Sequence, residues 1–220
     1  MCAKVSLLRN AQQQNEAAFN QASLKYTGFA NLAERFTHTP PVALIITHGY
    51  SGSGKSTYSD QLAEKMAALQ IRSDIERKRL FGYQAQADTG SGIDDGLYTQ
   101  EVSRKTYLYL ADCAKQVIEA GFSAIVDATF LKTEQRELFK KLAIEGGVKF
   151  IIIDFQASDE ELNRRVTQRK NDASEATPTV LKQQLQSAQA LSTEEQAYVI
   201  TVNTESDTVL GRLLEAITLD

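Results

Sequence analysis

Apolar runs of strand length alternate with amphipathic stretches along most of this chain. Three runs, at residues 42–47, 122–126 and 148–154, are rich in aliphatic and β-branched side chains, and shorter ones occupy residues 70–73 and 198–202. Such runs are typical of strands buried on both faces of a sheet. The intervening stretches predict helices over residues 57–69, 75–81, 98–120, 133–145, 179–191 and 207–217, with another that Ser158 caps. Strands that alternate with helices in this way predict an α/β fold with a five-stranded, mainly parallel sheet and helices on both faces.

Residues 1–39 differ from the rest of the chain in composition. They are rich in Gln, Asn and Ala, and their spaced apolar positions predict two helices with a break near Gly28. Pro40 and Pro41 then end helical structure and open the first core strand. We therefore expect an N-terminal helical appendage, residues 1–40, and a core domain, residues 41–220.

A glycine-rich motif directly follows the first core strand. Residues 49–56, GYSGSGKS, fit G-x-x-x-x-G-K-[ST] at every fixed position and open a predicted helix. Glycines permit the backbone to approach a ligand closely, and the amides of such a loop converge on a polyphosphate. Lys55 is expected to reach the β- and γ-phosphates and Ser56 to place its hydroxyl on Mg²⁺. The predicted nucleotide contacts in this region are Gly49, Tyr50, Ser51, Gly52, Ser53, Gly54, Lys55, Ser56 and Thr57.

Two aspartates follow strands that are expected to end at the same edge of the sheet. Asp74 follows the second strand, where a carboxylate can accept a proton from a substrate hydroxyl, although an aspartate there is equally suited to cap the next helix. Arg77 lies one turn further along and could hold an anionic group of the acceptor. Asp127 ends the run FSAIVD, a position that supports Mg²⁺ in nucleotide-binding folds, but it could also be a turn aspartate. Thr129 is expected to assist at the same place.

A basic helix precedes a polar break at residues 171–178. Arg165 and Arg169 are four residues apart, so both guanidinium groups can point into one cleft. There they could close over the polyphosphate as a short lid, neutralise charge and exclude water. The alternative is a solvated basic face whose arginines pair with Glu160 or Glu161.

Composition narrows the choice of partners and compartment. The 220 residues carry a net charge of −4, which gives no support for a broad nucleic-acid footprint. Cys2 and Cys113 are too few for a disulfide framework, and Cys113 is expected to be a small core residue. The chain begins without an apolar leader and contains no run long enough for a membrane span, so we expect a cytoplasmic protein.

Four segments resemble P-loop kinases that act on small molecules and polynucleotides. They are HGYSGSGKST, RSDIERKRLFG, GFSAIVDATFLKTEQR and LNRRVTQRKNDASEAT. This group includes polynucleotide 5′-kinase, zeta toxins, chloramphenicol phosphotransferase and gluconate kinases. The chain looks most like the uncharacterised kinase domain that some bacterial proteins carry after an aminoglycoside-phosphotransferase-like domain. The segment AKVSLLR is similar to the tail of that upstream domain, which would make this chain a short form without it.

The resemblance covers residues 42 to about 217 and implies roles for individual residues. It implies ATP on the glycine-rich loop, Asp74 as general base and Arg77 on the acceptor. It also implies Arg165 and Arg169 on a lid over ATP, with Asn203 and Thr204 beside the adenine. Tyr50 departs from the leucine or proline common at its position. Residues 83–98, in the acceptor region, match no characterised substrate class.

The sequence therefore predicts an ATP- and Mg²⁺-dependent kinase that phosphorylates a hydroxyl of a small molecule. Two alternatives stay open: a polynucleotide 5′-hydroxyl kinase, against which the acidic charge balance argues mildly, and an ATP-binding regulatory switch without an acceptor. A regulatory switch has no need of an acceptor base, so roles of Asp74 and Arg77 in acceptor binding would distinguish a kinase from a switch. The sequence also leaves a homodimer open.

Overall fold

The computed structural model describes residues 24, 26–28, 41–84, 99–168, 174, 176–206 and 208–218. The chain divides into two compact units, Met1–Pro41 and Val42–Asp220. In the first unit, residues 24 and 26–28 are helical. The rest of the two helices predicted there, and most of the stretch 83–98, lie outside the described residues.

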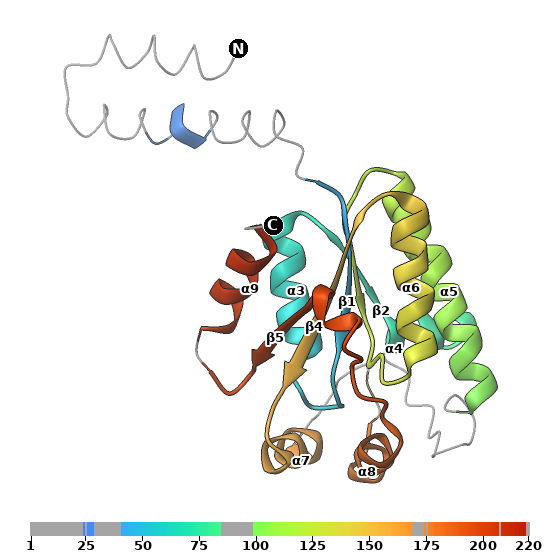
Figure 1. Ribbon diagram of the computed structural model, residues 1–220. Helices are drawn as coiled ribbons and strands as arrows, with labels where there is room; N and C mark the ends of the chain where they lie inside the picture. Colours follow the sequence, from blue (N-terminus) through green and yellow to red (C-terminus); the bar gives the residue numbers. More distant parts are fainter. Residues whose placement is uncertain are drawn as a thin grey trace. The chain divides into compact units, whose positions relative to one another are not determined.

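A five-stranded parallel sheet forms the centre of the second unit (Figure 1). Its order is β2-β3-β1-β4-β5, and every pairing is parallel, so the mainly parallel sheet predicted from the sequence is confirmed. The strands are β1 (Ala43–His48), β2 (Leu69–Arg72), β3 (Ala124–Asp127), β4 (Lys149–Gln156) and β5 (Val199–Asn203). Because all five run the same way, their carboxyl ends share one edge of the sheet.

Helices cover both faces of this sheet. They are α3 (Lys55–Met66), α4 (Ser73–Leu80), α5 (Gln100–Glu119), α6 (Thr133–Gly146), α7 (Asp159–Gln168), α8 (Pro178–Ser187), the 3₁₀ helix η2 (Glu195–Tyr198) and α9 (Val209–Thr218). Leu44 and Ile46 of β1 pack with α5 and α6, whereas Ile45 packs with α3 and α9. Alternate side chains of a strand point to opposite faces, so a strand covered on both sides is expected to be apolar on both, as the first four residues of β1 are.

A third, smaller cluster lies near the carboxyl edge of the sheet. Leu162 and Val166 of α7 pack with Leu181 of α8, and Tyr50 of the glycine-rich loop packs against them. The two helices are therefore anchored to the loop by apolar contacts. Within the part of the chain that the structure describes, none of the helices combines the length and apolar character that a membrane crossing requires.

Two predicted boundaries differ from the structure in ways that matter for the site. The helix predicted over residues 75–81 begins at Ser73, so Asp74 lies inside the first turn of α4 and not at the end of β2. The helix predicted over residues 179–191 ends at Ser187, because Ala188 adopts an extended backbone with ψ of 143°. Ser158 does cap α7 as expected, since its hydroxyl accepts from Glu161 N at 3.4 Å.

Candidate active site

The loop between β1 and α3 has a conformation that its glycines make possible. Gly49, Gly52 and Gly54 have φ angles of 137°, 87° and 86°, which side chains rarely allow. A Cβ at Gly49 would lie 2.5 Å from the Phe155 carbonyl oxygen, and one at Gly52 would lie 2.9 Å from that of Leu162. These two glycines therefore let β4 and α7 pack directly on the loop.

Lys55 is buried and folds back over the loop. Its Nζ donates to the Tyr50 carbonyl at 2.7 Å and lies 3.4 Å from Ser53 Oγ. Ser53 N in turn donates to the Tyr50 carbonyl at 3.1 Å. The ammonium is thus held against the backbone of a glycine-rich loop that opens a helix, an arrangement typical of polyphosphate sites.

Asp127 and Ser56 place oxygen atoms beside this ammonium. Asp127 ends β3 and is only 4% exposed. Burial raises the pKa of its carboxyl, while the hydrogen bond with Ser56 and the nearby Lys55 act in the opposite direction. A buried carboxylate next to a hydroxyl is a donor set that suits Mg²⁺, which is bound by few protein oxygens together with water and phosphate oxygens.

The raised pKa of Asp127 predicts that its charge lowers the stability of the nucleotide-free protein, although the same charge is needed to bind Mg²⁺. A carboxyl with a raised folded-state pKa favours the fold at low pH, and that contribution is lost as the pH rises through the folded pKa. Asp127→Asn should therefore raise the melting temperature of the nucleotide-free protein at pH 7 and abolish the extra stabilisation that Mg²⁺ adds to an ATP analogue.

Thermal unfolding with and without Mg²⁺ and the analogue measures both effects. The exposed Asp112 on α5 provides the control, because Asp112→Asn should change neither quantity. An Asp127→Asn protein that melts lower and keeps its Mg²⁺ response would show that this carboxylate is structural.

A cavity of about 300 Å³ brings the loop and the predicted acceptor residues together. Lys55, Ser56 and Asp127 line it together with Asp74, Arg77 and Thr129. Arg77 NH1 lies 3.6 Å from Asp74 Oδ1, and the Asp74 side chain keeps 24% of its surface exposed. The two groups that sequence analysis assigned to the acceptor therefore share one cavity with the groups assigned to the nucleotide and metal.

Most of the predicted loop residues also line this cavity, and the remainder support it. Ser51, Gly52, Gly54 and Thr57 belong to its wall, whereas Gly49, Tyr50 and Ser53 do not. Gly49 N donates to the Thr129 carbonyl at 3.2 Å, which ties the start of the loop to the segment after β3.

Helix α8 closes another side of the cavity, and sequence analysis did not assign a residue on it. Gln184 accepts from Ser51 N at 2.9 Å and donates to Ser51 Oγ at 3.0 Å. The side-chain amide thus docks α8 on the glycine-rich loop. A glutamine in a polar helix carries no local signal for such a contact, since its partner lies 133 residues earlier.

Arg165 contacts the loop from outside the cavity. Its guanidinium donates to the Gly52 carbonyl at 3.2 Å, to Thr204 Oγ1 at 2.9 Å and to Glu161 Oε1 at 2.6 Å. The structure therefore brings Arg165 and Thr204 together behind the loop, while Asn203 Oδ1 accepts from Glu205 N at 2.9 Å. Arg169 lies outside the described residues.

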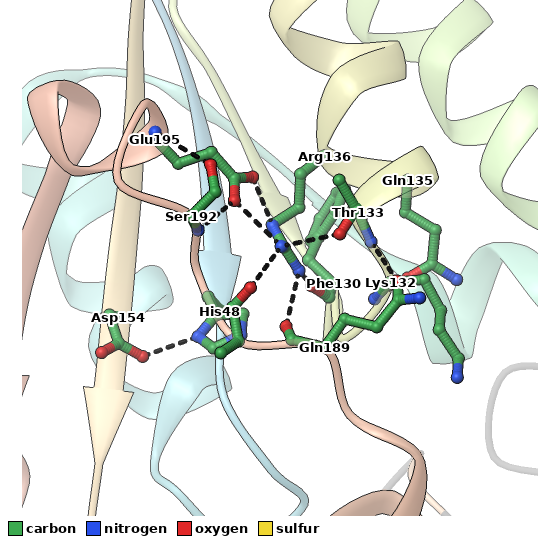
Figure 2. A network of polar contacts seen from close by, with 11 residues as sticks. His48, Phe130, Lys132, Thr133, Gln135, Arg136, Asp154, Gln189, Ser192 and Glu195 are labelled. Carbon is green, nitrogen blue, oxygen red and sulfur yellow. Dashed lines mark hydrogen bonds and ion pairs between the residues drawn. The ribbon is translucent and has the colours of Figure 1, made fainter.

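A buried ion pair fixes the segment that follows β3 (Figure 2). Arg136 of α6 donates to both carboxylate oxygens of Glu195 at 2.6 and 3.0 Å, and to the carbonyls of Phe130, Gln189 and Ala190 at 3.1–3.2 Å. Gln189 N also donates to the Leu131 carbonyl at 2.8 Å. The chain after α8 is thereby fastened to residues 130 and 131, next to the cavity wall.

Phe130 itself holds an unfavourable backbone conformation within this network. Its φ is 48°, and its side chain is fully buried against Tyr107 and Phe139. The Tyr107 hydroxyl accepts from Phe130 N at 3.1 Å and lies 3.5 Å from Thr129 Oγ1. Strained residues persist where the surroundings over-determine them, and both neighbours of Phe130, Thr129 and Leu131, line the cavity.

Another polar pair stands just before the loop. His48 Nδ1 lies 2.6 Å from Asp154 Oδ1 (Figure 2). The other Asp154 oxygen accepts from Gln156 Nε2 at 2.7 Å. This contact joins the ends of β1 and β4 where the chain enters the glycine-rich loop. Sequence analysis did not predict this interaction between His48 and Asp154, which stabilises the start of the loop.

The overall fold is that of P-loop NTPases and recurs in solved kinases. A sugar kinase from Janibacter sp. HTCC2649 superimposes with a TM-score of 0.62 at 19% identity, over 81% of this chain and 95% of the other. A gluconokinase from Sinorhizobium meliloti gives 0.58 at 16% identity over 83% and 94% of the two chains. The APS kinase CysC of Mycobacterium tuberculosis, solved with AMPPNP and APS, gives 0.58 at 16% identity over 82% and 98%.

Comparison of sequences gives a family and a longer relative. The uncharacterized protein Rv2004c of Mycobacterium tuberculosis is 25% identical over 178 residues, which are 81% of this chain and 35% of that protein. The chain thus spans only about a third of the length of this relative. A family model described as an AAA domain matches residues 44–191, from β1 through the glycine-rich loop to the chain just after α8. Since that match takes in most of the second unit, this chain belongs to the AAA domain family.

Proposed function

We propose that this protein is an ATP- and Mg²⁺-dependent kinase that transfers the γ-phosphate to a hydroxyl of a small molecule. The observation that carries the proposal is the shared cavity. Lys55, Ser56 and Asp127 line one part of it, and Asp74 and Arg77 line another. A switch that only binds nucleotide would have no use for a carboxylate and a guanidinium facing the same space as the phosphate-binding loop.

Each side chain has a role that its position supports. Asp74 accepts the proton of the acceptor hydroxyl, whose oxygen bonds to the γ-phosphorus while the bond to the β,γ-bridging oxygen breaks and ADP leaves. Lys55 and the loop amides bind the phosphate oxygens. Ser56 and Asp127 would hold Mg²⁺, which neutralises charge on those oxygens. Arg77 orients the acceptor.

The residues behind the loop take supporting roles in this proposal. Arg165 fixes the Gly52 carbonyl and Thr204, so it controls the shape of the loop over the polyphosphate. Asn203 and Thr204 are proposed for the adenine side, and Arg169 for the lid, on the resemblance described above. Loop and lid geometry of this kind acts through positioning, which supplies a large share of catalysis in phosphoryl transfer.

The relatives in structure support a small-molecule acceptor. They are described as a sugar kinase, a gluconokinase and an APS kinase solved with AMPPNP and APS. Ligands bind at the carboxyl edge of the sheet in open α/β folds, and this supports an acceptor position at that edge here.

Acceptor-stimulated release of ADP tests the proposal. Purified protein with Mg·ATP is screened over sugars, sugar acids, nucleosides, antibiotics and 5′-hydroxyl oligonucleotides. We expect stimulation by at least one small molecule, and loss of that stimulation in Lys55→Ala. Tight binding of Mg·ATP with no stimulation across the panel would favour the regulatory switch, and stimulation by oligonucleotides alone would favour the polynucleotide kinase.

A further inference from the structure

A second cavity, of about 700 Å³, adjoins the acceptor side of the candidate active site. The two cavities share four lining residues: Ser103, Tyr107, Lys132 and Gln135. The second one extends between α5 and the first two turns of α6, away from the glycine-rich loop. Because the two cavities adjoin each other, one ligand can occupy both of them at the same time.

The sizes of the two cavities suggest that they bind different parts of the acceptor. The first, of about 300 Å³, must take the transferred phosphate and the hydroxyl that receives it. The second is in the range of sites that bury a ligand of several rings. An acceptor as small as one sugar ring would leave most of this second space unused.

The walls of the second cavity are held in place by the network around Arg136. Gln189 Oε1 accepts from Thr133 N at 2.7 Å, and Gln135 Oε1 accepts from Lys132 N at 3.2 Å (Figure 2). Lys132 Nζ donates to the Ser187 carbonyl at the end of α8. These contacts fix the amides at the start of α6, so this part of the wall is pre-organised for a ligand.

The charges in the second cavity cancel. Among the described residues, its lining carries two cationic side chains, Arg104 and Lys132, and two anionic ones, Glu134 and Glu137. An oligonucleotide carries one phosphate per nucleotide and requires a basic surface, whereas a polycationic ligand requires an acidic one. The balance in this cavity suits neither and favours an uncharged ligand.

The uncharged lining groups indicate what kind of neutral ligand fits. Amides and hydroxyls come from Gln100, Gln135, Gln189, Ser103 and Thr133. Leu108, which is 47% exposed, and Leu138 supply apolar patches between them. Side-chain amides and hydroxyls pair with ligand hydroxyls, and small aliphatic patches pack on the C–H faces of a sugar ring.

We propose that the second cavity binds the distal part of an uncharged, hydroxyl-rich acceptor longer than one sugar ring, such as a glycoside or a short oligosaccharide. The inference rests on the proposed kinase function. The reacting hydroxyl sits at Asp74, gives up its proton there and bonds to the γ-phosphorus as ADP leaves. The next ring passes Ser103 and Tyr107 and lies against Leu108 between α5 and α6.

Matched acceptor pairs test this inference. Each pair contains a monosaccharide and its own disaccharide: glucose and maltose, galactose and lactose, and N-acetylglucosamine and chitobiose. Phosphorylation is followed by ADP release with Mg·ATP. We expect at least one disaccharide to be used with a kcat/KM about tenfold or more above that of its monosaccharide, the size expected when an extra group fills a pocket.

Filling the second cavity should remove this advantage. Leu108→Trp places a large ring in the wall of the second cavity, at a residue that does not line the first. We expect the preferred disaccharide to fall to the level of its monosaccharide, with monosaccharide turnover and ATP-analogue affinity unchanged. The matched control is Ile144→Trp on α6, another exposed aliphatic residue, which is 67% exposed and lines neither cavity.

The outcomes separate this inference from the proposed function. Equal use of both members of every phosphorylated pair, or a preference that survives Leu108→Trp, overturns the second cavity as an acceptor site and leaves the kinase intact. Phosphorylation of 5′-hydroxyl oligonucleotides in place of the sugars overturns the ligand class. A protein that binds Mg·ATP and phosphorylates no acceptor in either panel overturns both proposals together.

Discussion

Replacing Asp74 by asparagine is expected to lower acceptor phosphorylation by about 10²–10⁴-fold, the usual contribution of a positioned general base. The carboxylate lies in the same cavity as Lys55 and Asp127 and is the group assigned to the acceptor proton. Asparagine keeps the shape of the side chain but cannot take up that proton. The expected loss is in kcat, because the amide can still hydrogen-bond the acceptor.

The stability of the variant should change little. Asp74 is in the first turn of α4, where a negative charge stabilises a helix by about 0.3–1 kcal/mol, and its contact with Arg77 is partly exposed to water. Affinity for Mg·ATP should also be close to that of the wild type, since the proposal assigns Asp74 to the acceptor and not to the nucleotide. Asp60→Asn, an exposed change on α3, controls for the loss of one carboxylate.

Measured kcat with an acceptor from the screen decides between catalysis and helix stabilisation. Wild-type turnover in Asp74→Asn would mean that Asp74 serves only α4, and the base would have to be sought elsewhere in the cavity. A drop in kcat together with unchanged Mg·ATP affinity and melting temperature is what a proton acceptor produces.

The fold could be predicted because its signal is local. The runs at residues 42–47 and 148–154 are apolar on both faces, which only a covered parallel strand explains, and β1 and β4 lie where these runs are. The errors are at helix ends. Ala188, Ala190 and Leu191 favour helix by composition, yet the chain turns away after Ser187 because the Gln189 and Ala190 carbonyls bond to Arg136.

The same division holds for the candidate site. The glycine-rich loop is continuous in sequence, so its residues could be named from their spacing alone. Gln184 and Arg136 act through partners that lie more than 50 residues away along the chain. Nothing in the residues beside them marks such a contact, because a surface glutamine and a helical arginine are ordinary. Arg165 is an intermediate case. The sequence predicts it on a lid over the polyphosphate, and in the structure its guanidinium contacts Gly52 and Thr204, which no pattern in the sequence indicated.

The ion pair between Arg136 and Glu195 leads to the largest expected effect on stability. Arg136 is 1% exposed, and its removal leaves the Glu195 carboxylate buried without its cation. Breaking a buried pair from one side costs about 3–5 kcal/mol. Arg136→Met, which keeps much of the volume, should therefore lower the melting temperature by roughly 10 °C or more.

A double-mutant cycle apportions this loss. Arg136→Met with Glu195→Gln removes both charges, and neutral replacements of buried pairs are often tolerated well. We expect the double variant to be more stable than Arg136→Met and less stable than the wild type, because the Phe130, Gln189 and Ala190 carbonyls still lack their donor. Lys141→Ala, which breaks an exposed pair with Glu145 on the same helix, should cost at most about 1 kcal/mol.

The pH dependence of the loss identifies its physical origin. Burial alone would raise the pKa of the Glu195 carboxyl, but the hydrogen bonds from Arg136 and from Ser192 outweigh burial and hold the pKa below its ordinary value of 4.5. In the wild type, the stability that this carboxylate contributes is therefore present above pH 4.5 and is lost as the pH falls through the lower folded-state pKa.

In Arg136→Met the unpaired Glu195 carboxyl should take up a proton at a higher pH than in the wild type, which relieves the cost of burying its charge. The difference in unfolding free energy between the two proteins should consequently be largest near neutral pH and shrink in acid, as denaturant titrations at a series of pH values would show. A difference that stays constant with pH would place the whole effect on the three backbone carbonyls and none on the charge of Glu195.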